Sequence, residues 1–197
     1  MRLPKIAVFI ALLTPCFSTA HGQHKSEYVS LQADSCRSLE ASSVRDYYLT
    51  RGLMVSECPT KATVQSTPLQ IIIVSTDERS WIDLVLGHTI WSSEEEIVYE
   101  RENQFGFFPN VANAPAELRT SSLNVMGLIF RVTAQNPDQQ STIPGSSTLS
   151  RLFVIGFRGS GVCFVGTTND NATARSLLNS DVSCKRMLKI VKLIIEK

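Results

Sequence analysis

Residues 151–184, RLFVIGFRGSGVCFVGTTNDNATARSLLNSDVSC, decide the fold of this chain. Two short apolar runs rich in β-forming residues, 152–157 and 162–165, flank the tetrapeptide 158–161, whose two glycines can supply the positive φ of a tight turn. This arrangement predicts a β-hairpin. The polar run 167–171 that follows is typical of a helix N-cap. Four apolar residues then recur at helical spacing and predict a short helix packed on the hairpin: Ala172, Ala174, Leu177 and Leu178.

The cysteines predict two disulfides between sequence neighbours. Cys163 and Cys184 would close a short loop, and a strand followed by a returning helix brings such a pair together. Cys36 and Cys58 have a similar separation and would enclose a second unit. Four cysteines allow three connectivities, of which we favour Cys36–Cys58 with Cys163–Cys184. No C-x-x-C pair and no cysteine–histidine cluster is present, so we expect structural cysteines rather than a redox or zinc site.

Residues 1–20 predict an export signal. A positive start with Arg2 and Lys5 precedes the apolar run 6–13 and a small-residue cleavage site that ends at Ala20. Cys16 allows a lipoprotein as an alternative, but Pro15 stands where a lipoprotein box needs a small residue. We therefore expect cleavage after Ala20 and a periplasmic or secreted protein.

Charge and length limit the possible partners. The chain has 19 basic and 18 acidic residues, and the loss of Arg2 and Lys5 with the signal leaves a net charge of −1. Nucleic acid and anionic membranes are therefore not expected partners. We expect a disordered lead-in over 21–27 and a single domain over 28–197, with no membrane segment after the signal. No cofactor and no metal site is predicted, since His21 and His24 lie together only in the lead-in.

The N-terminal half of the domain predicts one helix and several strands. Ser42 or Ser43 can cap a short helix that ends at Gly52, and a strand then leads to Cys58. Gly87-His88 between two apolar runs is typical of a type II′ hairpin turn. The expected strands are 53–55, 69–74, 81–86, 89–91, 97–99 and 128–132, and residues 135–150 are expected to form a surface loop.

The C-terminal segment after Cys184 has a basic face and an apolar face at helical spacing. We expect a terminal helix that covers the sheet, and a helix on a membrane surface or a partner is the alternative. The fold class predicted from the whole pattern is α+β. It consists of an antiparallel sheet with a short N-terminal helix, one or two C-terminal helices and two disulfides.

Phe107, Phe108 and Asn110 are the candidate binding residues. They belong to the stretch Phe105-Gly-Phe-Phe-Pro-Asn110, in which aromatic residues beside glycine and proline either fill the core or form a binding surface. Asn113 is a polar neighbour. His88 in a turn, the glycines of 156–161 and the capping run 167–171 are explained by local structure, and no G-x-S-x-G motif is present.

The chain resembles a group of small exported bacterial proteins over residues 77–184. The resemblance is carried by Asp77-Glu78-Arg79-x-Trp81, Tyr99-Glu100, Phe107-Phe108-Pro109-Asn110, residues 130–135 and the Cys163–Cys184 unit. It implies a periplasmic location and no particular activity.

The leading functional hypothesis is a non-enzymatic module that binds another envelope protein, or inhibits one. The first alternative is an envelope hydrolase with a dispersed carboxylate site, formed by Asp83 with Glu94, Glu95 and Glu96. This acidic run, with Glu100, is otherwise a solvated loop or sheet edge. The second alternative is a structural or assembly factor of the envelope.

Overall fold

The computed structural model describes residues 24–76, 78–99, 106–121, 124–137, 148–159, 161–180 and 183–193. The predicted export signal, Cys16, His21, Asp77, Glu100 and Phe105 lie outside these ranges. So do most of the predicted loop 135–150 and the last four residues of the predicted terminal helix.

The first sheet contains the predicted hairpin at its centre. Its strands run in the order β1-β8-β9-β10-β11-β12, and all of its pairings are antiparallel. A further strand, β7, pairs with the end of β9 that β8 does not reach. The strands are β1 (His24–Val29), β7 (Phe107–Val111), β8 (Ala116–Ser121), β9 (Asn124–Gln135), β10 (Thr148–Arg158), β11 (Gly161–Thr168) and β12 (Arg186–Met187).

The second sheet has the order β13-β6-β5-β4-β2, with the short β3 paired to β4. The Gly87-His88 turn joins β5 to β6 as predicted, with Gly87 at a φ of +60°. The chain crosses from the first sheet to the second between β12 and β13. The strands are β2 (Met54–Cys58), β3 (Thr63–Val64), β4 (Thr67–Ser75), β5 (Ser80–Leu86), β6 (Thr89–Ser92) and β13 (Lys189–Lys192).

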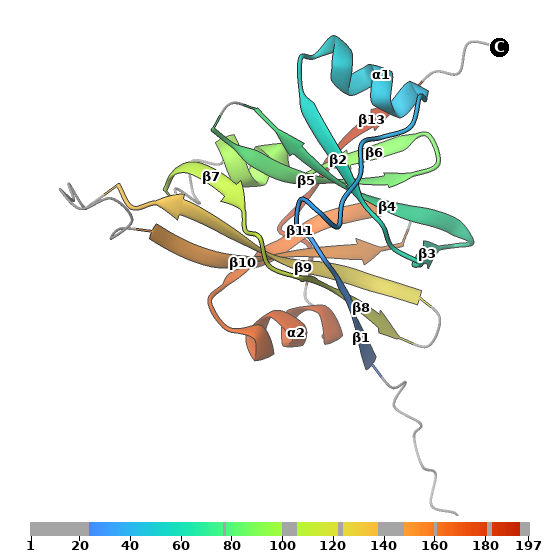
Figure 1. Ribbon diagram of the computed structural model, residues 1–197. Helices are drawn as coiled ribbons and strands as arrows, with labels where there is room; N and C mark the ends of the chain where they lie inside the picture. The colour runs from blue at the N-terminus through green and yellow to red at the C-terminus, as the bar shows by residue number, and fades with distance from the viewer. Residues whose placement is uncertain are drawn as a thin grey trace, which may run out of the picture.

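The two sheets stack, and each outer face carries one helix (Figure 1). Helix α1 (Ser43–Thr50) lies above the second sheet, and α2 (Asn171–Asn179) lies below the first. Both helices begin at a capping side chain. The Ser42 hydroxyl accepts a hydrogen bond from the backbone N–H of Arg45 at 3.3 Å, and the Asp170 carboxylate accepts one from Thr173 at 2.6 Å. No helix in the described ranges is long and apolar enough to cross a bilayer.

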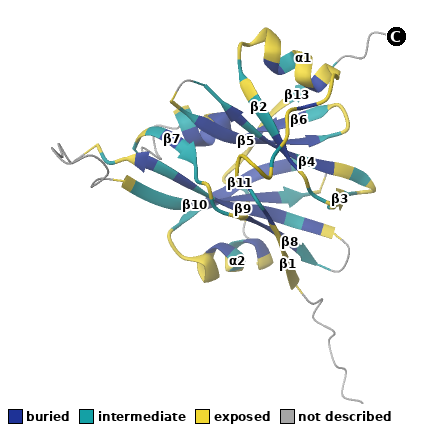
Figure 2. Cartoon of the chain, in the orientation of Figure 1, coloured by how far each residue is buried: buried dark blue, intermediate teal, exposed yellow. Residues whose placement is uncertain are grey.

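Most of the buried apolar residues lie between the two sheets, where the strands of Figure 2 are darkest. Phe153 of β10 packs against Phe130 and Phe164 from the neighbouring strands, with ring centroids 6.0 Å apart in each case. A smaller cluster fills the space between the first sheet and α2. A Cβ at Gly127 would collide with the carbonyl of Ile155 and with Leu178, so this glycine lets α2 approach the sheet closely.

Both predicted disulfides, Cys36–Cys58 and Cys163–Cys184, are present. The first links the loop after β1 to β2, and the second links β11 to the segment that follows α2. The arrangement inferred from strand and helix spacing is therefore confirmed.

The predicted α+β class is wrong, because 55% of the described residues lie in strands and only 16% in helices. The largest error is the segment after Cys184, which forms β12 and β13 instead of a helix. Its apolar residues fit both a helical and a strand period, and Ile190 and Val191 are β-branched. In β13, pairing with β6 supplies the backbone hydrogen bonds that a helix would have formed within itself.

Two shorter predictions are also corrected. The predicted strand 97–99 lies in a π-helical turn, η1 (Glu95–Tyr99). His24–Glu27, placed by the sequence in a disordered lead-in, pair with β8 as part of β1. These β1 residues are exposed and polar, so their sequence carries little strand signal, and the backbone of β8 provides the partner.

Candidate functional site

Phe107 and Phe108 lie at an irregularity of β7 that exposes the first ring. Phe107 is 58% exposed, and Phe108 is half-buried beside it. The register between β7 and β9 shifts between Phe107 and Asn110, and Phe108 has a φ of +50°. A bulky residue rarely adopts this left-handed conformation, which costs about 1 kcal/mol or more. The strand therefore stores strain at the position where sequence analysis placed a binding surface.

The Asn110 side chain holds this irregularity in place and also lines the cavity of about 380 Å³ described below. Its side-chain N–H₂ donates to the carbonyl oxygens of Glu78 at 2.8 Å and Phe108 at 3.0 Å. Its side-chain oxygen accepts from the Ser80 hydroxyl at 3.1 Å, and the backbone N–H of Val111 donates to the same hydroxyl at 2.8 Å. These bonds join β7 to the start of β5. Asn110 is thus a positioning residue, and Asn113 lies exposed beyond the end of β7.

Arg79 completes this region and was not selected from the sequence. Its guanidinium lies over the Phe108 ring, 5.2 Å from the centroid. We define the Phe107 surface as Arg79, Val98, Phe107, Phe108 and Pro137, which line a cavity of about 240 Å³ together with Gly106 and Pro109. A second cavity of about 380 Å³ lies on the other side of Phe108. No sequence signal could identify Arg79, because the contact spans the two sheets.

The three glutamates of the hydrolase hypothesis each pair with a basic residue of a different element. Glu94 pairs with Arg51 of α1 at 3.2 Å, Glu96 with Arg186 of β12 at 2.9 Å, and Glu95 with Lys189 of β13 at 3.7 Å. Each carboxylate therefore belongs to a different contact between elements. This distribution is typical of ion pairs that tie a fold together.

Asp83 is buried between β5 and α1, with 1% of its surface exposed. The Tyr48 hydroxyl donates to its carboxylate at 2.9 Å. Burial raises the pKa of Asp83 to about 7, although hydrogen bonds from Ser92 and Tyr48 act in the opposite direction and nearby Glu94 adds to the rise. Asp83 lines neither the cavity beside Phe107 nor the one on the other side of Phe108. Its geometry is that of a buried polar contact under a helix.

The other sequence candidates have local structural roles. His88 is exposed in the β5–β6 turn, and its backbone carbonyl accepts from Leu193 at 2.9 Å. Gly159 has a φ of +58° in the β10–β11 turn. Residues 167–171 end β11 and begin α2, with Asp170 as the N-cap.

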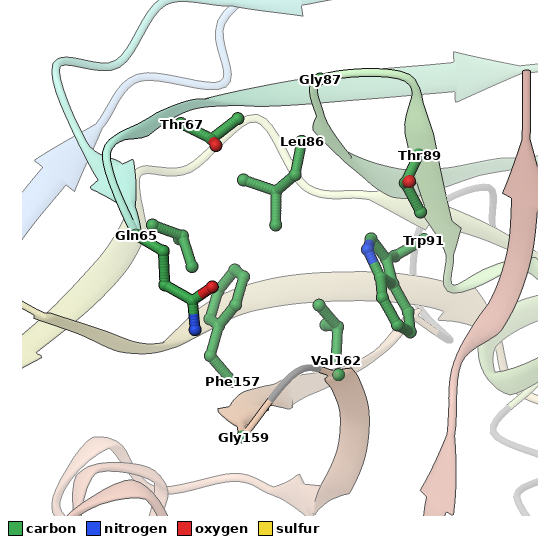
Figure 3. A pocket seen from close by; sticks show the side chains of 11 residues that line it. Gln65, Thr67, Leu86, Gly87, Thr89, Trp91, Phe157, Gly159 and Val162 are labelled. Carbon is green, nitrogen blue, oxygen red and sulfur yellow. The ribbon is translucent and has the colours of Figure 1, made fainter.

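A cavity of about 250 Å³ is lined by residues of both sheets, near the β3–β4, β5–β6 and β10–β11 turns (Figure 3). Phe157 and Val162 come from the first sheet, and Leu86 and Trp91 from the second. The close-up shows the Gln65 side chain beside the Phe157 ring, with Trp91 across the cavity. Its lining contains no ionisable side chain, so this cavity can bind neutral molecules but carries no acid–base group.

The Gln65-Ser66 turn at the rim of this cavity is strained. Both residues have positive φ, 50° and 66°, as a two-residue type I′ turn requires, and Asn-Gly is the pair that prefers this conformation. Replacing the pair by Asn-Gly should raise the free energy of unfolding by about 1 kcal/mol in urea denaturation. Ala41→Gly, in a loop without positive φ, should lower it instead. A lower free energy of unfolding in the Asn-Gly variant would contradict the inference that Gln65 and Ser66 are strained.

A buried ionic network joins β1, β8 and α2. Glu117 is 4% exposed and accepts hydrogen bonds from Arg175 at 2.8 to 3.0 Å and from Ser26 at 2.5 Å. Arg119, 6% exposed, lies 3.6 Å from Glu117 and donates to Ser26 and to Asn179. Burial acts to raise the pKa of Glu117, but these hydrogen bonds and the two positive charges outweigh it and keep the pKa below its ordinary value.

No protein-family model, curated protein or solved structure matches this chain.

Proposed function

We propose that this chain is an exported, disulfide-stabilised binding module that contacts another envelope protein through the Phe107 surface. Two disulfides are compatible with an oxidising compartment outside the cytoplasm. The export signal expected in residues 1–20 and the resemblance over 77–184 support the same location.

The exposed Phe107 ring carries the proposal. An aromatic ring that is more than half exposed loses apolar hydration when a partner covers it, and aromatic residues contribute strongly to protein–protein interfaces. The adjoining cavity of about 240 Å³ is lined mainly by apolar side chains and has Arg79 as its cation. Among the described residues Arg79 forms no ion pair. A partner that inserts an apolar side chain and places a carboxylate beside Arg79 fits this combination.

The rigid backbone of β7 favours a role of the exposed Phe107 ring in binding. The Asn110 and Ser80 hydrogen bonds hold the backbone from the carbonyl of the strained Phe108 to the N–H of Val111. A surface that is already fixed loses little conformational entropy on association, which favours affinity. The strain at Phe108 is thus maintained by the contact between β5 and β7.

Phe107→Ala should weaken the complex with the partner at least tenfold without unfolding the protein. The ring is exposed, so its removal takes contact area from the interface and almost none from the core. A photoreactive phenylalanine analogue at position 107 should first identify the partner in the producing cells. Isothermal titration calorimetry of the purified pair then gives the affinity of each variant.

Leu49→Ala is the matched control, since Leu49 is a similarly exposed apolar residue on α1. The photoreactive analogue at position 49 should not cross-link the same partner, and Leu49→Ala should bind with unchanged affinity. Equal cross-linking from both positions, or unchanged affinity in Phe107→Ala, would show that the Phe107 surface is not the binding site.

A further inference from the structure

A further cavity, with several polar side chains in its lining, lies on the outer face of the first sheet, where α2 begins. It has a volume of about 220 Å³ and draws side chains from β1, β8, β9, β10 and α2. Its main lining residues are Tyr28, Glu117, Ile129, Arg131, Leu152 and Arg175. None of these six residues belongs to the Phe107 surface, so a ligand in this cavity does not depend on a partner at that surface.

The cavity has an excess of positive charge. Glu117 is the one carboxylate in its lining, and three hydrogen bonds from Arg175 and the nearby Arg119 already neutralise it. Arg131 donates to the Ser150 hydroxyl at 2.8 Å, and no carboxylate in the described ranges pairs with it. Asp170 is the other acid near Arg175, and its carboxylate is bonded to Thr173. Three arginines against Glu117 and Asp170 leave one net positive charge.

Both lining arginines keep donors for a ligand. Arg175 uses Nε and Nη2 for Glu117 and Tyr28, which leaves Nη1 without a partner in the described ranges. Within the described part of the chain, Arg131 uses Nη1 alone, for Ser150. The planar guanidinium matches the two oxygens of a carboxylate with parallel hydrogen bonds.

The rest of the lining is mainly apolar, with the Asn171 side chain and the Tyr28 hydroxyl as further polar groups. Ile129 and Leu152 are buried in the first sheet beneath α2, and Pro115 and Ala114 belong to the loop before β8. A volume of about 220 Å³ corresponds to roughly seven molecules of liquid water. The space therefore suits a short acyl or similar apolar group beside one charged head.

We propose that this cavity binds a small monocarboxylate, with the carboxylate against Arg131 and Arg175 and the apolar body against Ile129 and Leu152. Glu117 holds Arg175 in position for this contact. The neutral amide of the same acid offers the same apolar body without the charge and should bind weakly.

The test is an NMR or calorimetric titration of the full protein with butyrate, butyramide and inorganic phosphate as separate probes. Butyrate should bind and should perturb the amides of β9 and of the first turn of α2. Arg131→Gln should weaken butyrate binding at least tenfold, and Arg131→Lys should weaken it less, because it keeps the charge and loses the planar fork. Arg45→Gln, an exposed arginine on α1, is the control and should bind butyrate like the unmodified protein.

Three kinds of result would overturn the assignment. The first is no butyrate binding up to about 10 mM, a range in which even weak specific sites bind. The second is equal binding of butyrate and butyramide, or equal butyrate binding by Arg131→Gln and the unmodified protein. The third is binding of phosphate alone, which would indicate a phosphate site in place of a carboxylate site.

Discussion

Glu117→Gln is expected to lower the free energy of unfolding by about 3 to 5 kcal/mol, because it leaves the buried Arg119 without its neutralising charge. Glutamine has nearly the volume of glutamate and can still accept one bond from Arg175, so the loss comes from charge and not from a cavity. Arg119 is 6% exposed and cannot recover its hydration without moving the strand. Urea denaturation of both proteins at pH 7 measures the difference.

A second substitution separates this cause from a simple packing defect. In the Glu117→Gln background, Arg119→Met removes the unpaired cation and should restore part of the lost stability. Glu27→Gln, an exposed glutamate on β1, is the control and should change stability by less than about 0.5 kcal/mol. If Glu117→Gln costs no more than Glu27→Gln, the network does not stabilise the contact between β1, β8 and α2.

Stability should also fall as the pH rises from about 4 to about 7, because of Asp83. Burial raises the pKa of Asp83 from 3.8 to about 7, so the folded protein keeps a proton in this range that the unfolded chain has lost. The contribution of Asp83 is therefore fully present below pH 4 and is lost as the pH passes through 7. A difference of about three pH units corresponds to about 4 kcal/mol at most.

Asp83→Asn removes the titration while its amide oxygen can still accept from the Tyr48 hydroxyl. Urea denaturation between pH 4.5 and 8 should show the unmodified protein losing stability relative to this variant as the pH rises. Asp34→Asn, at an exposed turn, should follow the pH profile of the unmodified protein. Parallel profiles for Asp83→Asn and the unmodified protein would show that Asp83 is ionised in the folded state across the whole range.

Sequence reasoning succeeded where the signal is local. The hairpin around 158–161 is specified by two β-forming runs and the glycines between them, and the two helices by capping side chains at Ser42 and Asp170. The disulfide pairs follow from the same local geometry, since each pair closes a short loop, with sequence separations of 22 and 21. All of these features depend on contacts within a short stretch of chain.

It failed where a distant segment supplied the partner. Residues 189–192 are Lys-Ile-Val-Lys, and two adjacent apolar residues have neither a helical nor a strand period, so pairing with the edge of β6 selects the strand. Residues 24–27 are polar and show no strand pattern in the sequence. Pairing with β8 places them in a strand as well. Interstrand hydrogen bonds depend little on side-chain type, so the sequence of such an edge strand does not reveal that it is one.

The candidate binding site likewise has features that the sequence predicts and features that depend on distant contacts. Phe107 and Phe108 could be selected from their composition, but whether the rings fill the core or face solvent depends on the register of β7 against β9. The stacking of Arg79 on Phe108, and the meeting of Arg131 with Arg175 around one cavity, join residues that are far apart in the sequence.

The sequence by itself determined the hairpin, the two helix starts and the cysteine pairing, because short-range sterics, capping and loop closure act between residues that are close along the chain. Only the tertiary structure decided the mainly β class, the burial of Asp83 and Glu117, the Phe107 surface and the cavity between Arg131 and Arg175. Each of these depends on which strands lie side by side, and that is set by the packing of the whole core.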